Sequence, residues 1–143
     1  MQLNSDSSLI QFIKYGIVGA MNTMLTLGVI FLCKSCLGLN PYVSNGLGYA
    51  IGLINSFIWN RRWVFKADGS LSRHALYFLL GFAICYAVQL LVVWLLNKSA
   101  FGDLRVDVMG MVISGYGLAT LIGNVVYTIC NFIYNKVVVF VKK

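Results

Sequence analysis

Two short segments of this sequence combine residue types that suit the binding of a phosphate beside a polar ligand. Asn60–Phe65 (Asn-Arg-Arg-Trp-Val-Phe) ends one long apolar stretch, and Asn135–Phe140 (Asn-Lys-Val-Val-Val-Phe) ends another. An Arg guanidinium presents a planar fork of donors to phosphate oxygens, and a Lys ammonium presents a point charge. An Asn amide both donates and accepts hydrogen bonds, as recognition of sugar hydroxyls requires.

These properties define two sets of candidate residues. The candidate phosphate-binding residues are Arg61, Arg62 and Lys136. The candidate sugar-binding or path-lining residues are amides inside apolar stretches, namely Asn22, Asn55, Asn60, Asn131 and Asn135. The alternatives are that the cations only anchor the chain at ordinary lipid headgroups, and that the amides make interhelical hydrogen bonds worth about 0.6 kcal/mol each.

The composition indicates which elements must position these residues. Of 143 residues, 59% are hydrophobic and 10% are charged, against about 25% charged in soluble domains. Four uncharged windows are each long enough to cross a hydrocarbon core about 30 Å thick. They run from about residue 15 to 33, 35 to 60, 75 to 97 and 108 to 135. We therefore expect an all-α membrane protein with four transmembrane helices, at about 10–33, 42–62, 72–97 and 108–136.

The distribution of cations predicts the orientation. If the helices alternate in direction, one side of the membrane receives Lys14, Arg61, Arg62, Lys66, Arg73, Lys136, Lys142 and Lys143, and the other receives Lys34, Lys98 and Arg105. The positive-inside rule then places both termini in the cytoplasm, with residues 1–9 as a polar tail. The net charge of +7 does not indicate nucleic acid, because the cations lie at the ends of apolar segments rather than on one soluble surface.

The two motif copies indicate an internal repeat, one copy at about residues 10–66 and the other at about 72–141. An offset of 75 residues places Asn60 on Asn135, and an offset of 62 places Tyr15 on Tyr77. Since each half contains two helices, the halves enter the membrane in the same direction, as a parallel repeat.

Local signals predict helix ends and packing faces. Pro41 suits the first turn of a helix, and Ser70 or Ser72 suits an N-cap. Gly48–Gly52 forms a GxxxG pattern that permits close helix contact, either in a homodimer or within one chain. Four short helices enclose too little volume to build a polar pathway alone, so a homodimer is favoured.

No catalytic set or cofactor motif is visible. The carboxylates (Asp6, Asp68, Asp103 and Asp107) and the single histidine, His74, lie at or beyond the ends of the expected helices. A proton-coupled exporter would need a carboxylate within the membrane. Cys33 and Cys36 could form a redox pair or part of a metal site. We favour the interpretation that they are only small residues at a helix end, because neither a third thiol nor a His is expected on that side.

The motifs resemble those of the GtrA-like family of small four-helix membrane proteins. The similarity covers about residues 10–141 and is carried by Phe12–Gly19, Asn22-Thr23, Asn55–Phe57 and Asn60–Phe65. The second copy departs from the pattern, with Lys136 in place of Arg and Val138 in place of Trp.

The resemblance implies a function in cell-surface polysaccharide synthesis. Members of this family are thought to move polyprenyl-phosphate-linked sugars, such as undecaprenyl-phosphate glucose, to the outer leaflet of the bacterial inner membrane, where a membrane glycosyltransferase uses them. The alternatives are a non-transporting adaptor that positions a glycosyltransferase and a small-solute exporter. We expect membrane lipid as a partner, and we expect neither a cofactor nor a nucleic acid partner.

Overall fold

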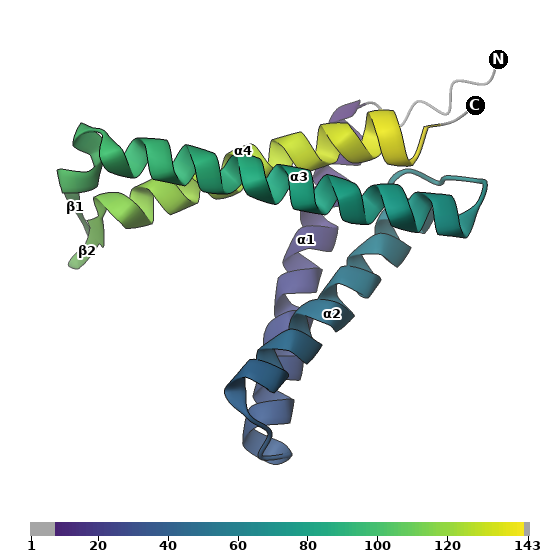
Figure 1. The fold of residues 1–143 in the computed structure, drawn as a ribbon, viewed down its shortest axis with the longest axis horizontal. Helices are drawn as coiled ribbons and strands as arrows, with labels where there is room; N and C mark the ends of the chain where they lie inside the picture. Colours follow the sequence, from purple (N-terminus) through teal and green to yellow (C-terminus); the bar gives the residue numbers. More distant parts are fainter. Residues whose placement is uncertain (1–7, 142–143) are drawn as a thin grey trace. The chain divides into compact units, whose positions relative to one another are not determined.

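The computed structural model describes residues 8–141, apart from the side chains of residues 100 and 101. It contains four long helices and one β-hairpin (Figure 1). The chain divides into two units, of which unit 1 ends at Gly69 and unit 2 comprises Ser70–Val141. The first seven residues of the predicted polar tail lie outside the described residues, and the next two already belong to the first helix.

Unit 1 is a pair of packed helices. Helix α1 (Ser8–Phe31) continues into the π-helix η1 (Leu32–Cys36), and α2 (Pro41–Trp59) continues into the π-helix η2 (Asn60–Val64). Pro41 begins α2, as predicted, and the Asn40 side chain accepts a hydrogen bond from the Tyr42 amide at 2.8 Å.

Glycines bring α1 and α2 into close contact. A β-carbon added at Gly48 would lie 2.5 Å from Ile30 Cγ1, and one added at Gly52 would overlap the hydroxyl of Thr26. The GxxxG pattern therefore serves packing between two helices of one chain, which was one of its two predicted uses.

Unit 2 is a second helix pair with a longer connection. Its elements are α3 (Leu71–Lys98), the 3-10 helix η3 (Ala100–Asp103), β1 (Arg105–Val108), β2 (Met111–Ser114), α4 (Gly115–Tyr134) and the π-helix η4 (Asn135–Val139). Ser70, rather than Ser72, caps α3 by accepting a hydrogen bond from the Arg73 amide. Gly81 packs against the Tyr134 ring, and a β-carbon at Gly123 would lie 2.7 Å from Val93 Cγ2.

The connection in unit 2 corrects the prediction of an all-α chain. Residues 105–114 form an antiparallel hairpin, and α4 begins at Gly115 rather than near residue 108. Met109 and Gly110 have φ values of +52° and +85°, as a two-residue type I′ turn requires. The Asp107 carboxylate accepts a hydrogen bond from the Gly110 amide at 3.0 Å, and β-branched residues flank the turn, so local chemistry favours strands here.

Three helical stretches are long and apolar enough to cross a membrane: Ser8–Cys36, Leu71–Lys98 and Gly115–Val139. Among the described helices, α2 does not meet this condition, because the Ser, Asn and Gly residues among its 19 positions lower its mean hydropathy. Large apolar side chains nevertheless remain exposed on every helix. Exposed apolar surface on this scale indicates contact with lipid, so the protein is a mostly helical membrane protein.

Candidate functional site

Both copies of the Asn-cation motif begin a π turn. Asn60 opens η2 and Asn135 opens η4. The Asn60 carbonyl accepts a hydrogen bond from the Phe65 amide at 2.9 Å, and the Asn135 carbonyl accepts one from the Phe140 amide at 2.8 Å. A π turn spaces its hydrogen bonds over five residues and is frequent at functional sites. The two motifs therefore begin with the same type of helical turn within their own units.

The two asparagines are buried but incompletely hydrogen-bonded. Each side chain is only 1% exposed. Asn60 Nδ2 donates to Ser56 Oγ at 3.1 Å, whereas Asn60 Oδ1 has no partner. Neither polar atom of the Asn135 side chain has one. Because burying an unbonded polar atom is costly, hydrogen bonding within the unit does not account for the burial of these amides.

An aromatic side chain closes each motif. The Phe65 ring lies 6.5 Å from the Tyr15 ring, and the Phe140 ring lies 6.4 Å from Phe78 and 5.4 Å from His74. Tyr15 and Phe78 thus each lie beside the aromatic residue that ends a motif, and they are 63 residues apart in the sequence.

Buried residues on α1 and α3 follow the same spacing of 63 residues. Tyr15 and Val18 are buried on α1, and Phe78 and Gly81 are buried on α3. Gly19, which the predicted offset matched to Gly81, is exposed with nothing beside it.

The three candidate cations differ in their surroundings. Arg61 is half-buried, and its Nη2 donates to the Gly69 carbonyl at 2.9 Å. Arg62 is exposed. Lys136 is half-buried, with its Nζ 5.9 Å from the centre of the Phe132 ring. Arg62 and Lys136 are therefore the cations best placed to meet an external anion, whereas Arg61 also holds the backbone near the end of unit 1.

The remaining candidate amides occupy different positions. Asn22 and Asn55 are half-buried in unit 1. Asn22 Oδ1 has no hydrogen-bond partner and lies beside Gly52. Asn131 is buried in unit 2, and its Nδ2 donates to Tyr127 Oη at 3.5 Å. The predicted residues thus divide between the units: Arg61, Arg62, Asn22, Asn55 and Asn60 lie in unit 1, and Lys136, Asn131 and Asn135 in unit 2.

Two further polar groups in unit 1 were not among the candidates. Lys14 Nζ lies 5.8 Å from the centre of the Trp63 ring, which adds a cation near the first motif. Gln11 Oε1 is buried without a hydrogen-bond partner. Helical spacing could have indicated Gln11, because Gln11, Tyr15 and Asn22 are spaced so that they lie on one face of α1.

The described residues contain no group of three His, Cys, Asp or Glu that could hold a metal ion. All four cysteines are unbridged, with Cys33 buried and Cys36 exposed in η1. The chemistry of the candidate site is therefore that of amides, cations and aromatic rings.

Comparison with known proteins identifies the family. Residues 14–140 match the family described as GtrA/DPMS, transmembrane domain. The chain belongs to this family. The resemblance inferred from the sequence motifs is thereby confirmed.

Several phage-derived relatives cover nearly the whole chain. The bactoprenol-linked glucose translocase of Shigella phage SfV is 27% identical over 130 residues, which cover 90% of this chain and 93% of that protein. The prophage bactoprenol-linked glucose translocase homolog of Escherichia coli K12 is 26% identical over 129 residues, covering 90% and 93%. These names describe translocases and not enzymes, in agreement with the prediction of a non-enzymatic membrane protein.

A further relative shows a shorter match. The uncharacterized membrane protein YngA of Bacillus subtilis strain 168 is 37% identical over 60 residues, which cover 39% of this chain and 40% of that protein. This chain therefore matches less than half of the YngA protein.

Proposed function

We propose that this protein is a flippase-like translocase of a polyprenyl-phosphate-linked sugar in the bacterial inner membrane. The chain crosses the membrane four times as two parallel repeats, residues 10–66 and 72–141, with both termini in the cytoplasm. The relatives named as bactoprenol-linked glucose translocases support a substrate of this class.

The observation that carries the proposal is the pair of buried amides at the starts of η2 and η4. Asn60 and Asn135 each precede a cation, and Asn60 leaves one side-chain polar atom, and Asn135 two, without a protein partner. A sugar hydroxyl both donates and accepts hydrogen bonds and can satisfy such atoms. The neighbouring cation can hold the phosphate at the membrane interface.

In this mechanism the residues divide by charge. Each unit offers its own cations to the phosphate, Arg61 and Arg62 in unit 1 and Lys136 in unit 2, and Arg61 also orders the backbone at Gly69. The amides Asn22, Asn55, Asn60, Asn131 and Asn135 contact the sugar or line its path. Movement follows the concentration gradient of the lipid-linked sugar, and a membrane glycosyltransferase consumes that sugar outside.

The proposal includes a homodimer. Gly16 and Gly19 on α1 have open space around them, and Thr23 on the same helix is exposed. Small residues of this kind allow a second helix to approach closely.

A membrane adaptor that positions a glycosyltransferase is the second candidate, favoured by the cations at the helix ends, which would serve a protein partner equally well. The exporter alternative lacks a feature it requires. Among the described residues, the carboxylates Asp68, Asp103 and Asp107 all lie outside helices α1–α4.

Lipid-sugar binding separates translocase from adaptor. Purified protein in nanodiscs is mixed with polyprenyl-phosphate glucose, and retained lipid is measured by native mass spectrometry. The double variant Arg62→Ala, Lys136→Ala should bind at least about a hundredfold more weakly, because each charge-assisted hydrogen bond that is lost is worth about 1.5–3 kcal/mol. The control is Lys98→Ala, which removes a cation at the C-terminal end of α3, outside both motifs. Unchanged binding in the double variant, with weaker pull-down of the glycosyltransferase, would favour the adaptor.

A further inference from the structure

The β1–β2 hairpin of unit 2 has one wholly apolar face. Cross-strand pairing places Val106 opposite Ile113 and Val108 opposite Met111. Because paired residues share a face and alternate along each strand, these four side chains form one surface, the apolar hairpin face. The other face carries Arg105, Asp107, Val112 and Ser114. The hairpin is therefore amphipathic.

Most of the apolar hairpin face is uncovered. Met111 is 71% exposed, and Val106 and Val108 are also exposed. Met109, at the turn, is 100% exposed. Its φ of +52° is a conformation in which Gly or Asn is usual and a large side chain is uncommon. An apolar side chain kept at a strained and fully exposed position suggests that it contacts something outside the unit.

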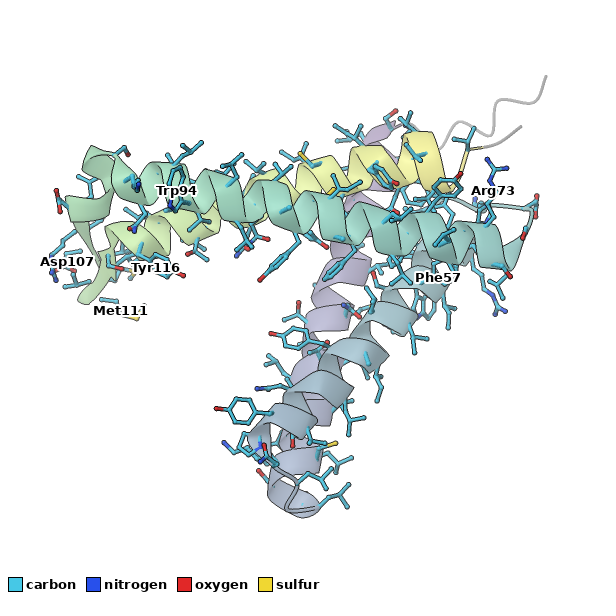
Figure 2. The ribbon with its side chains drawn as sticks, viewed as in Figure 1. Phe57, Arg73, Trp94, Asp107, Met111 and Tyr116 are labelled. Atoms are coloured by element: carbon cyan, nitrogen blue, oxygen red, sulfur yellow. The ribbon has the colours of Figure 1, made fainter. Side chains whose placement is uncertain are left out.

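The neighbouring elements place the hairpin at a membrane surface. It joins two helical stretches that are each long and apolar enough to cross a membrane. Exposed aromatic residues flank it, Trp94 near the end of α3 and Tyr116 in the first turn of α4. Trp and Tyr in such positions mark the membrane–water interface. Figure 2 shows both aromatics at the same end of unit 2 as Asp107 and Met111.

The hairpin is also fixed in direction. Ser114 ends β2 and caps α4 by accepting a hydrogen bond from the Gly117 amide at 3.2 Å. A β-carbon at Gly117 would lie 3.2 Å from Ile113 Cγ2, so the strand packs closely on the start of the helix. Figure 1 shows that the strands turn aside from the line of α3 and α4. A hairpin that turns aside from membrane-spanning helices runs along the membrane surface rather than away from it.

We propose that this hairpin is an interfacial anchor that lies on the lipid surface. The apolar hairpin face and Met109 enter the boundary between headgroups and acyl chains, and Arg105 and Asp107 face water. The occupant is lipid because the hairpin directly joins two membrane-spanning stretches and lies between the exposed interfacial aromatics Trp94 and Tyr116. The anchor requires only that unit 2 spans a membrane, so it stands whether or not the protein moves a lipid-linked sugar.

Two adjacent residues provide a matched test. Met111 and Val112 are both apolar and similarly exposed, at 71% and 63%, yet they lie on opposite faces. Met111→Cys and Val112→Cys are each made in a Cys36→Ser background and labelled with an environment-sensitive fluorophore. The Cys36→Ser protein without an added cysteine is labelled in parallel, and its signal measures any label on the three remaining native cysteines. Each protein is placed in nanodiscs containing lipids spin-labelled near the headgroup.

The expected result is strong lipid quenching at residue 111 and weak quenching at residue 112, with the reverse order for aqueous iodide. Met109→Cys should behave like Met111→Cys and gives a second reading if one variant misfolds. Equal lipid quenching at 111 and 112 would overturn the proposal. Protection of residue 111 from iodide without lipid quenching would also overturn it, because a protein partner would then cover the face.

Discussion

Replacing Gly52 with Ala tests the close contact between α1 and α2. A β-carbon at this position overlaps the Thr26 hydroxyl and lies 3.3 Å from Asn22 Oδ1. Thr26 is buried and β-branched, so it has few rotamers to move into within a helix. The helices must separate, or Thr26 must adopt a less favourable rotamer.

A matched variant on the same helix isolates this cost. Ala is favoured over Gly in a helix interior by about 1 kcal/mol, and overpacking costs about 1–3 kcal/mol. Gly46 is also in α2, but nothing lies within 4 Å of an added β-carbon. Gly46→Ala should therefore gain about 1 kcal/mol of stability, and Gly52→Ala should be less stable than Gly46→Ala by about 1–3 kcal/mol.

Unfolding in mixed detergent micelles, followed by circular dichroism of the helices, measures both variants. Adding Thr26→Ala to Gly52→Ala should recover most of the loss, because it removes the overlapping hydroxyl. If Gly52→Ala and Gly46→Ala unfold with the same free energy, the close approach of α1 and α2 at Gly52 is refuted.

Three further predictions concern polar side chains and the hairpin turn. Asn135→Leu should leave the free energy of unfolding in micelles unchanged or raise it, because its amide has no partner to lose. Asn60→Leu should lower that free energy by about 0.6 kcal/mol, and both changes should reduce lipid-linked glucose transport into liposomes. Gly110→Ala should destabilise the hairpin by about 1–2 kcal/mol, because φ is +85° there, with faster amide hydrogen exchange as the readout. Gln89 Nε2 donates to Asn124 Oδ1 at 2.6 Å, so a double-mutant cycle with Leu at both positions should give a coupling of about 0.6 kcal/mol.

Much of the fold follows from local signals in the sequence. Pro41 and Ser70 mark helix starts because their backbone and side-chain chemistry suits a first turn. The long uncharged windows predict three of the spanning stretches because lipid excludes charge. Gly48 and Gly52 are spaced for close packing, although only the structure shows that their neighbour is α1 of the same chain.

Other features depend on information that residue types alone do not carry. Val108–Ile113 is apolar enough to resemble the start of a spanning helix, and the turn at Met109 and Gly110 is what distinguishes it most clearly. The π turns at Asn60 and Asn135 add one residue to a helical turn without a distinctive composition. The sequence did not predict the bond that ties Arg61 to Gly69, because that bond depends on how the chain turns after η2.

That bond has a thermodynamic consequence. The Arg61 carbonyl accepts a hydrogen bond from the Ala67 amide at 2.8 Å, while its guanidinium binds the Gly69 carbonyl directly before unit 2 begins. An anion that gains affinity from this ordered guanidinium must stabilise the ordered backbone by the same free energy, because linkage is reciprocal. Under the proposed function, a phosphate bound at Arg61 therefore also stabilises the peptide between η2 and α3.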